Sequence, residues 1–72
     1  MDIRSAEKLV LKTYPGYVVT RRFQGVLDGE AMFAFILTKD EVLNVTVTVQ
    51  NGSVMEANGP MASLIISSLK EA

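Results

Sequence analysis

The sequence predicts a two-layer α+β domain, in which an N-terminal and a C-terminal helix flank a four-stranded antiparallel meander in the order α-β-β-β-β-α. Apolar side chains recur every three or four positions near both ends of the chain, which is the period of a helix. In the middle of the chain apolar and polar side chains alternate, which is the period of a strand. Tight turn signals separate the alternating segments, and tight turns join only antiparallel strands. Residues 1–72 are expected to form one small domain.

The N-terminal helix is expected over residues 3–14. Asp2 stands in front of it, where a carboxylate accepts hydrogen bonds from the free amides of the first turn. The segment Tyr14-Pro15-Gly16 is expected to end the helix, because a proline disfavours helical backbone in the residue before it. The buried stripe of this helix is expected to be Ile3, Ala6, Leu9, Val10 and Tyr14.

Four strands are expected after this helix, and turn residues separate them. The turns are expected at Asp28-Gly29, at Lys39–Glu41 and at Asn51-Gly52, of which the last is the strongest hairpin signal. The strands then cover residues 17–24, 31–38, 42–49 and 53–57.

The alternation predicts which side chains share the buried face of the sheet. A three-residue loop at 39–41 pairs Leu37 with Leu43 and gathers six apolar residues on one face: Phe33, Phe35, Leu37, Leu43, Val45 and Val47.

The registers of the other two hairpins are predicted from the requirement that the apolar side chains share one buried face. In the first hairpin a two-residue loop would place polar side chains in the core. An odd-length loop or a bulge near Gly25 is therefore expected, with Phe23 opposite Phe33. In the third hairpin a three-residue loop at 50–52 is expected, because it pairs Val47 with Met55.

The C-terminal helix is expected over residues 60–70. Pro60 suits the first position of a helix, and Lys70 is expected in the last turn, where a positive charge is favoured. The apolar stripe of this helix is expected to be Met61, Leu64, Ile65 and Leu69.

The opposite face of the sheet carries a second apolar set, which is the candidate protein-interaction surface. Its residues are Met32, Ala34 and Ile36 on the second strand, with Val18 and Val54 as neighbours. Either the second helix covers this set, or both helices share the other face and leave the set for a partner. The second arrangement is preferred because helices usually segregate to one side of an antiparallel sheet. It predicts a homodimer in which Met32 and Ile36 lie near the two-fold axis.

The composition argues against catalysis and against metal or cofactor binding. The chain has no cysteine and no histidine, so it lacks the usual thiol nucleophile, general base and metal ligands. Two pairs of acidic residues, Asp28 with Glu30 and Asp40 with Glu41, are neighbours in turns, where solvation alone explains them. The longest apolar run, Ala31 to Leu37, is too short for a membrane span, and no signal segment is recognisable. A cytoplasmic protein that is not an enzyme and has no cofactor is expected.

A row of basic residues supports an alternative function. Arg4, Lys8 and Lys12 are spaced by four and therefore lie along one side of the first helix. Together with Arg21 and Arg22 they are the candidate phosphate contacts of a small nucleic-acid-associated accessory protein. A net charge of −1 argues against this function.

Residues 3–57 resemble the PepSY domain. The matching segments are Lys12-Thr13-Tyr14-Pro15-Gly16, Val18-Val19, Asp28-Gly29 and Val45-x-Val47-x-Val49-x-Asn51-Gly52-x-Val54. The resemblance implies a helix packed on an antiparallel meander and a binding or inhibitory role, and it carries over no catalytic residue. The chain departs from the family by its second helix and by the lack of an export signal. The leading expectation is a non-enzymatic protein-binding module that self-associates and inhibits or regulates its partner.

Overall fold

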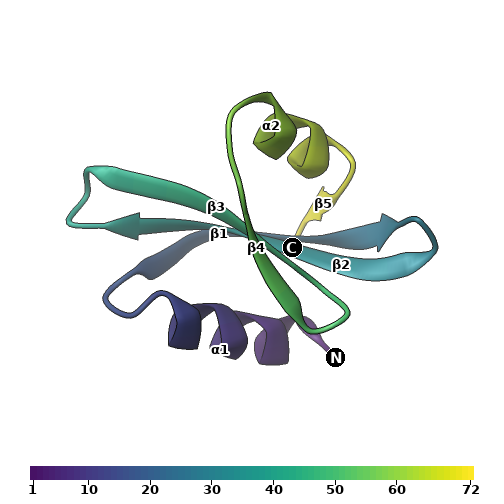
Figure 1. Cartoon of the computed structure of the whole chain (residues 1–72), viewed down its shortest axis with the longest axis horizontal. Coiled ribbons are helices and arrows are strands. Elements are labelled where there is room, and N and C mark those ends of the chain that lie inside the picture. The colour runs from purple at the N-terminus through teal and green to yellow at the C-terminus, as the bar shows by residue number, and fades with distance from the viewer.

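The computed structural model describes all residues from Met1 to Ala72 and contains two helices and a five-stranded antiparallel sheet (Figure 1). The elements are α1 (Ile3–Thr13), β1 (Val18–Leu27), β2 (Glu30–Lys39), β3 (Leu43–Gln50), β4 (Ser53–Ala57), α2 (Pro60–Ser67) and β5 (Lys70–Glu71). The strands lie in the order β4-β3-β2-β1-β5. The predicted α+β meander with a helix towards each end is confirmed, and β5 is an additional strand.

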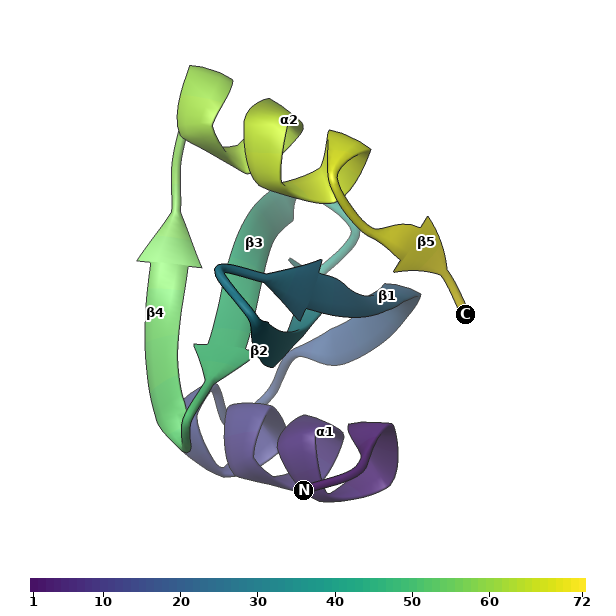
Figure 2. The ribbon, with the colours of Figure 1, turned by 90° about the vertical axis from the view of Figure 1, so that its right-hand side faces the viewer.

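The two helices lie on opposite faces of the sheet (Figures 1 and 2). α1 packs on the face that carries Phe33 and Phe35, which we call the α1 face. α2 and the residues after it pack on the α2 face, which carries Phe23, Met32 and Ala34. The prediction that both helices share one face was therefore wrong. The α2 face of β2 is itself apolar, so covering it within the chain removes apolar surface from water that would otherwise stay exposed.

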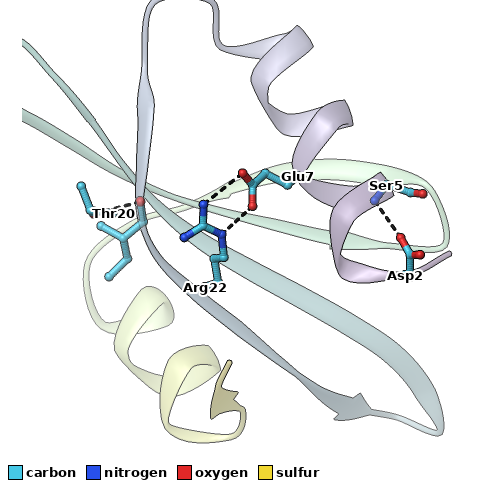
Figure 3. A network of polar contacts seen from close by, with 6 residues as sticks. Asp2, Ser5, Glu7, Thr20 and Arg22 are labelled. Atoms are coloured by element: carbon cyan, nitrogen blue, oxygen red, sulfur yellow. Dashed lines mark hydrogen bonds and ion pairs between the residues drawn. The ribbon is translucent and has the colours of Figure 1, made fainter.

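α1 begins and ends within one residue of the prediction. The Asp2 carboxylate accepts a hydrogen bond of 2.9 Å from the Ser5 N–H (Figure 3), and this bond lowers the pKa of Asp2. Ala6 and Val10 are fully buried against the sheet. At the other end the Tyr14 N–H closes the last turn on the Val10 carbonyl at 2.9 Å. Local capping and the proline that follows Tyr14 therefore set both ends of this helix.

The β1–β2 hairpin has the two-residue turn that the pattern argued against. Asp28 and Gly29 both have positive φ angles, 53° and 78°, and Leu27 pairs with Glu30. This register places Phe23 opposite Ala34 and thus on the α2 face. The predicted pairing of Phe23 with Phe33 was wrong, because the prediction assumed that only one face of the sheet is buried.

The irregularity predicted for β1 exists, but it is a bulge at Thr20 and not near Gly25. The register shifts between Val19 and Arg21, and the Thr20 hydroxyl donates a 3.0 Å hydrogen bond to the Ile36 carbonyl (Figure 3). The polar side chains of β1 that point to the α1 face, Arg22 and Gln24, stay exposed, since α1 makes most of its contacts with β2, β3 and β4.

In the β2–β3 hairpin the odd-numbered side chains of both strands share the α1 face, as predicted. The register is displaced by two residues, since Leu43 pairs with Lys39 and not with Leu37. The loop of this hairpin spans residues 40–42, because Asp40 and Glu41 adopt left-handed backbone with φ of 54° and 60°. Leu43 therefore pairs with Lys39 and is 56% exposed, whereas Val49 takes a core position that the prediction omitted. The core of the α1 face is Ala6, Val10, Phe33, Phe35, Leu37, Val47 and Val49.

The β3–β4 hairpin also has a two-residue turn, formed by Asn51 and Gly52 with φ of 52° and 74°. Val47 consequently pairs with Glu56, so the prediction of a three-residue loop that pairs Val47 with Met55 was wrong. Asparagine tolerates left-handed backbone, so this dipeptide supplies both central residues of a type I′ turn. Gly52 therefore has the positive φ that the second central residue of such a turn requires.

We expect Gly52→Val to lower the free energy of unfolding by more than about 1 kcal/mol, because a β-branched residue is strained at positive φ. A Cβ at this position would meet no atom within 4 Å, so backbone strain alone would cause the loss. Thermal unfolding measures the effect, and Gly52→Asn is the control because asparagine tolerates this backbone conformation. A Gly52→Val protein with the parent melting temperature would contradict the assignment of a strained turn.

The C-terminal segment is a helix followed by a short strand instead of one longer helix. α2 ends at Ser67, and Lys70, which lies in β5, pairs with Gln24 of β1. The Ala72 N–H also donates a 2.9 Å hydrogen bond to the Arg22 carbonyl. The open edge of β1 offers these partners to the last residues, which is why Lys70 lies in a strand and not in the predicted helical turn.

The apolar side chains that the C-terminal segment packs on the sheet differ in part from the predicted stripe. Leu69 is 9% exposed and belongs to the core of the α2 face with Phe23, Met32 and Ala34, while Ile65 and Ile66 pack against this core. Met61 and Leu64, which the stripe also included, are 59% and 65% exposed.

Candidate protein-interaction site

The apolar set predicted as the interaction surface is divided by the fold. Met32 and Ala34 are 6% and 0% exposed beneath the C-terminal segment, and Ile36 is half-buried beside them. Val18 is exposed, whereas Val54 packs against the core of the α1 face. Met32 and Ala34 are therefore covered within one chain, which is the alternative that the sequence left open for the second helix.

An open hydrogen-bonding side is found instead on β4. This strand pairs with β3 on one side, and no element of the chain lies beyond it on the other (Figure 2). Met55, in the middle of the strand, is 66% exposed. An edge strand presents a row of unpaired N–H and C=O groups, which is a template for pairing with another strand.

The register of the hairpin identifies the backbone groups that point outward from β4. Ser53 and Gln50 flank the two-residue turn and form a hydrogen-bonded pair, and in an antiparallel ladder such pairs alternate with pairs that are not hydrogen-bonded. Met55 and Ala57 therefore direct their N–H and C=O groups inward to β3. Val54 and Glu56 direct theirs to the open edge.

The other edge of the sheet is protected in ways that β4 is not. β5 pairs with the middle of β1, a bulge interrupts β1 at Thr20, and Arg21 and Arg22 add charges beside the bulge. Bulges and basic side chains are devices by which edge strands avoid pairing with other chains. β4 contains no proline, lysine, arginine or bulge, and its one charged residue is Glu56.

A hydrogen bond joins the open strand to Tyr14, the residue that follows α1. The Tyr14 hydroxyl donates to Oε1 of Glu56 at 3.0 Å. Burial raises the pKa of Tyr14, and the hydrogen bond to the Glu56 carboxylate raises it further. The Tyr14 ring also meets the Tyr17 ring edge to face, with centroids 5.7 Å apart. The single charge on β4 is thus bonded within its own chain.

The basic residues of the alternative function do not form one surface. Arg21 points to the α2 face, where its guanidinium binds both carboxylate oxygens of Glu71 at 2.7 and 2.8 Å and lies 5.0 Å from the centre of the Phe23 ring. The guanidinium lowers the pKa of Glu71 through this hydrogen-bonded pair. The remaining four cations lie on the other side of the sheet or along α1: Arg4, Lys8, Lys12 and Arg22.

Three of these four cations line a groove between α1 and β1 with a volume of about 480 Å³: Arg4, Lys8 and Arg22. Glu7 also lines the groove, and its carboxylate oxygens accept hydrogen bonds of 2.6 and 3.1 Å from the Arg22 guanidinium (Figure 3). This pairing lowers the pKa of Glu7 and raises that of Arg22. The charge of Arg22 is therefore balanced inside the groove, and Lys12 does not line it.

The sequence analysis did not single out β4 as the open strand, although the signal was present. In a meander, strands that follow one another in the chain are neighbours in the sheet, so the last strand of the meander lies at an edge. α2 does not cover that edge, because it lies on a face of the sheet (Figure 2).

Comparisons with protein-family models, with curated proteins and with solved structures gave no significant match. The PepSY resemblance therefore stays a prediction. Neither α1 nor α2 combines the length and the apolar character that a membrane-spanning helix needs. No three acidic side chains come close enough together to hold a metal ion.

Proposed function

We propose that this chain is a non-enzymatic protein-binding module that associates with a second copy of itself through the open edge of β4. The observation that carries the proposal is the pair of outward-facing backbone positions, Val54 and Glu56, on an edge strand without protective features. A partner strand satisfies these N–H and C=O groups in the way that β3 satisfies the inner side of β4.

The size and charge of the chain favour association between copies. A domain of 72 residues buries a small core, so the burial of further surface between copies adds to a narrow stability margin. A net charge of −1 provides little repulsion between copies. The nucleic-acid function has weaker support, because Arg21 and Arg22 point to opposite faces and each is paired with a carboxylate.

A proline at position 56 tests the edge directly. Glu56→Pro removes the outward N–H of that residue and leaves the inward hydrogen bonds of β4 intact, since prolines are tolerated on the open side of an edge strand. We expect the parent to be a dimer at micromolar concentration in light scattering and sedimentation. We expect the dissociation constant of Glu56→Pro to rise at least tenfold.

Glu56→Ala is the matched control for this substitution. It removes the same carboxylate and the same hydrogen bond to Tyr14, but it keeps the backbone N–H. We expect it to remain a dimer and to have a circular dichroism spectrum similar to that of Glu56→Pro. Equal dissociation constants for the two variants, or a parent that is monomeric at all concentrations, would overturn the proposal.

A further inference from the structure

We propose that the two copies pair β4 with β4 in one antiparallel register, in which Met55 lies opposite Met55 of the second copy on the two-fold axis. This inference rests on the proposed function and specifies the geometry of the same edge. It follows from the positions of the outward groups, from the charge of Glu56 and from the length of β4.

The outward groups allow three registers for a symmetric antiparallel pair, because Val54 and Glu56 must face each other or themselves. If Val54 faces its own copy, Glu56 faces Gly52, which lies in the turn and not in the strand. If Glu56 faces its own copy, two carboxylates lie directly opposite each other, which is destabilising.

The third register has neither fault. Val54 of each copy faces Glu56 of the other, and the strands overlap over their whole length, from Ser53 to Ala57. Both of these pairs exchange their N–H and C=O hydrogen bonds across the interface. The two carboxylates lie apart, each beside an apolar side chain and each still within reach of its own Tyr14.

The same register is compatible with the layers of the fold. The two-fold axis stands perpendicular to the sheet, so the sheets of both copies join into one, with both α1 helices on one side and both α2 helices on the other. Met55 points to the α2 face and is 66% exposed in the single chain. Its contact with the second copy covers it at the centre of the interface.

Cysteine cross-linking tests the register, because the chain has no cysteine of its own. In Met55→Cys the two sulfurs belong to directly opposed residues of a pair that is not hydrogen-bonded. The Cα atoms of such a pair are about 4.5 Å apart, within the range that a disulfide spans. We expect most of the Met55→Cys protein to become a covalent dimer under mild oxidation, as seen on a non-reducing gel.

Ser53→Cys is the control, since Ser53 lies on the same strand, points to the same face and is exposed. In the proposed register the two copies of residue 53 are four positions apart along the strand, or about 13 Å, too far for a disulfide. We expect this variant to sediment as a dimer at the concentration at which the parent is a dimer, and to form no covalent link.

A pair of lysine variants tests the interface without relying on a disulfide. Met55→Lys places two positive charges opposite each other at the axis, so we expect at least a tenfold rise in the dissociation constant. Met61→Lys introduces the same charge on the exposed side of α2 and should leave the dimer unchanged. Cross-linking of Ser53→Cys, or a parent dimer that Met55→Cys does not link, would overturn the register and leave the edge association standing. A parent that sediments as a monomer would overturn both.

Discussion

Replacing Phe35 with alanine is expected to lower the free energy of unfolding by about 3–5 kcal/mol, close to the whole stability of a domain of this size. Phe35 is fully buried in the middle of β2, and it lies opposite Val47 beneath α1. Its removal leaves a cavity that the neighbouring strands cannot close without losing their ladder hydrogen bonds. Denaturant unfolding, followed by circular dichroism, measures the loss.

Leu43→Ala is the matched control for Phe35→Ala. Leu43 was predicted to belong to the same core, but it is 56% exposed at the start of β3. We expect its truncation to change the free energy of unfolding by less than about 0.5 kcal/mol, as for most surface positions. If Leu43→Ala were as destabilising as Phe35→Ala, the β2–β3 hairpin would have to adopt the predicted register, in which Leu43 pairs with Leu37 in the core.

Replacing Leu69 with alanine is expected to lower the free energy of unfolding by about 2–3 kcal/mol. Leu69 joins the C-terminal segment to the α2 face, where it shares a core with Phe23, Met32 and Ala34. It packs directly on the backbone of β1 at Gly25: a Cβ at Gly25 would lie only 2.8 Å from Cδ2 of Leu69. The absence of a side chain at this position explains the close approach of the two segments.

Leu64→Ala serves as the control for Leu69→Ala, because Leu64 lies on the same C-terminal segment and is 65% exposed. We expect Leu64→Ala to unfold like the parent. Hydrogen exchange adds a local readout: the Ala72 amide, which bonds to the Arg22 carbonyl, should lose protection in Leu69→Ala and keep it in Leu64→Ala. Equal stabilities of the two variants would contradict the docking of the C-terminal segment on the α2 face.

The covering of Met32 and Ala34 changes where a partner can bind. An apolar face that the chain covers itself contributes to folding and cannot also bind a second molecule without opening. The surface that remains for association is therefore a strand edge, whose specificity comes from backbone groups and register more than from a large apolar patch. Met55 is the one large apolar side chain on that edge that is exposed.

Local chemistry was sufficient to predict the two helices, the four strands of the meander and the alternation of side chains on β2 and β3. Asp2 and the Tyr14-Pro15-Gly16 segment mark the ends of α1, and the alternation of β2 and β3 separates the side chains of the two faces correctly. The turns lie close to where their residues indicate, at Asp28-Gly29 and Asn51-Gly52. These features depend on residues that are neighbours in the chain, so the sequence alone determined them.

The tertiary structure decided what depends on competition between distant segments. The exact registers of the hairpins, the side of the sheet that α2 covers and the end of α2 at Ser67 all differ from the expectation. The errors in the β1–β2 register and in the placement of α2 share one cause: the α2 face of β2 is apolar, and Leu69 and Ile65 reach it from far along the chain. Once both faces are buried, Phe23 has a core position opposite Ala34, two-residue turns are acceptable, and the edge of β4 is left as the open side of the sheet.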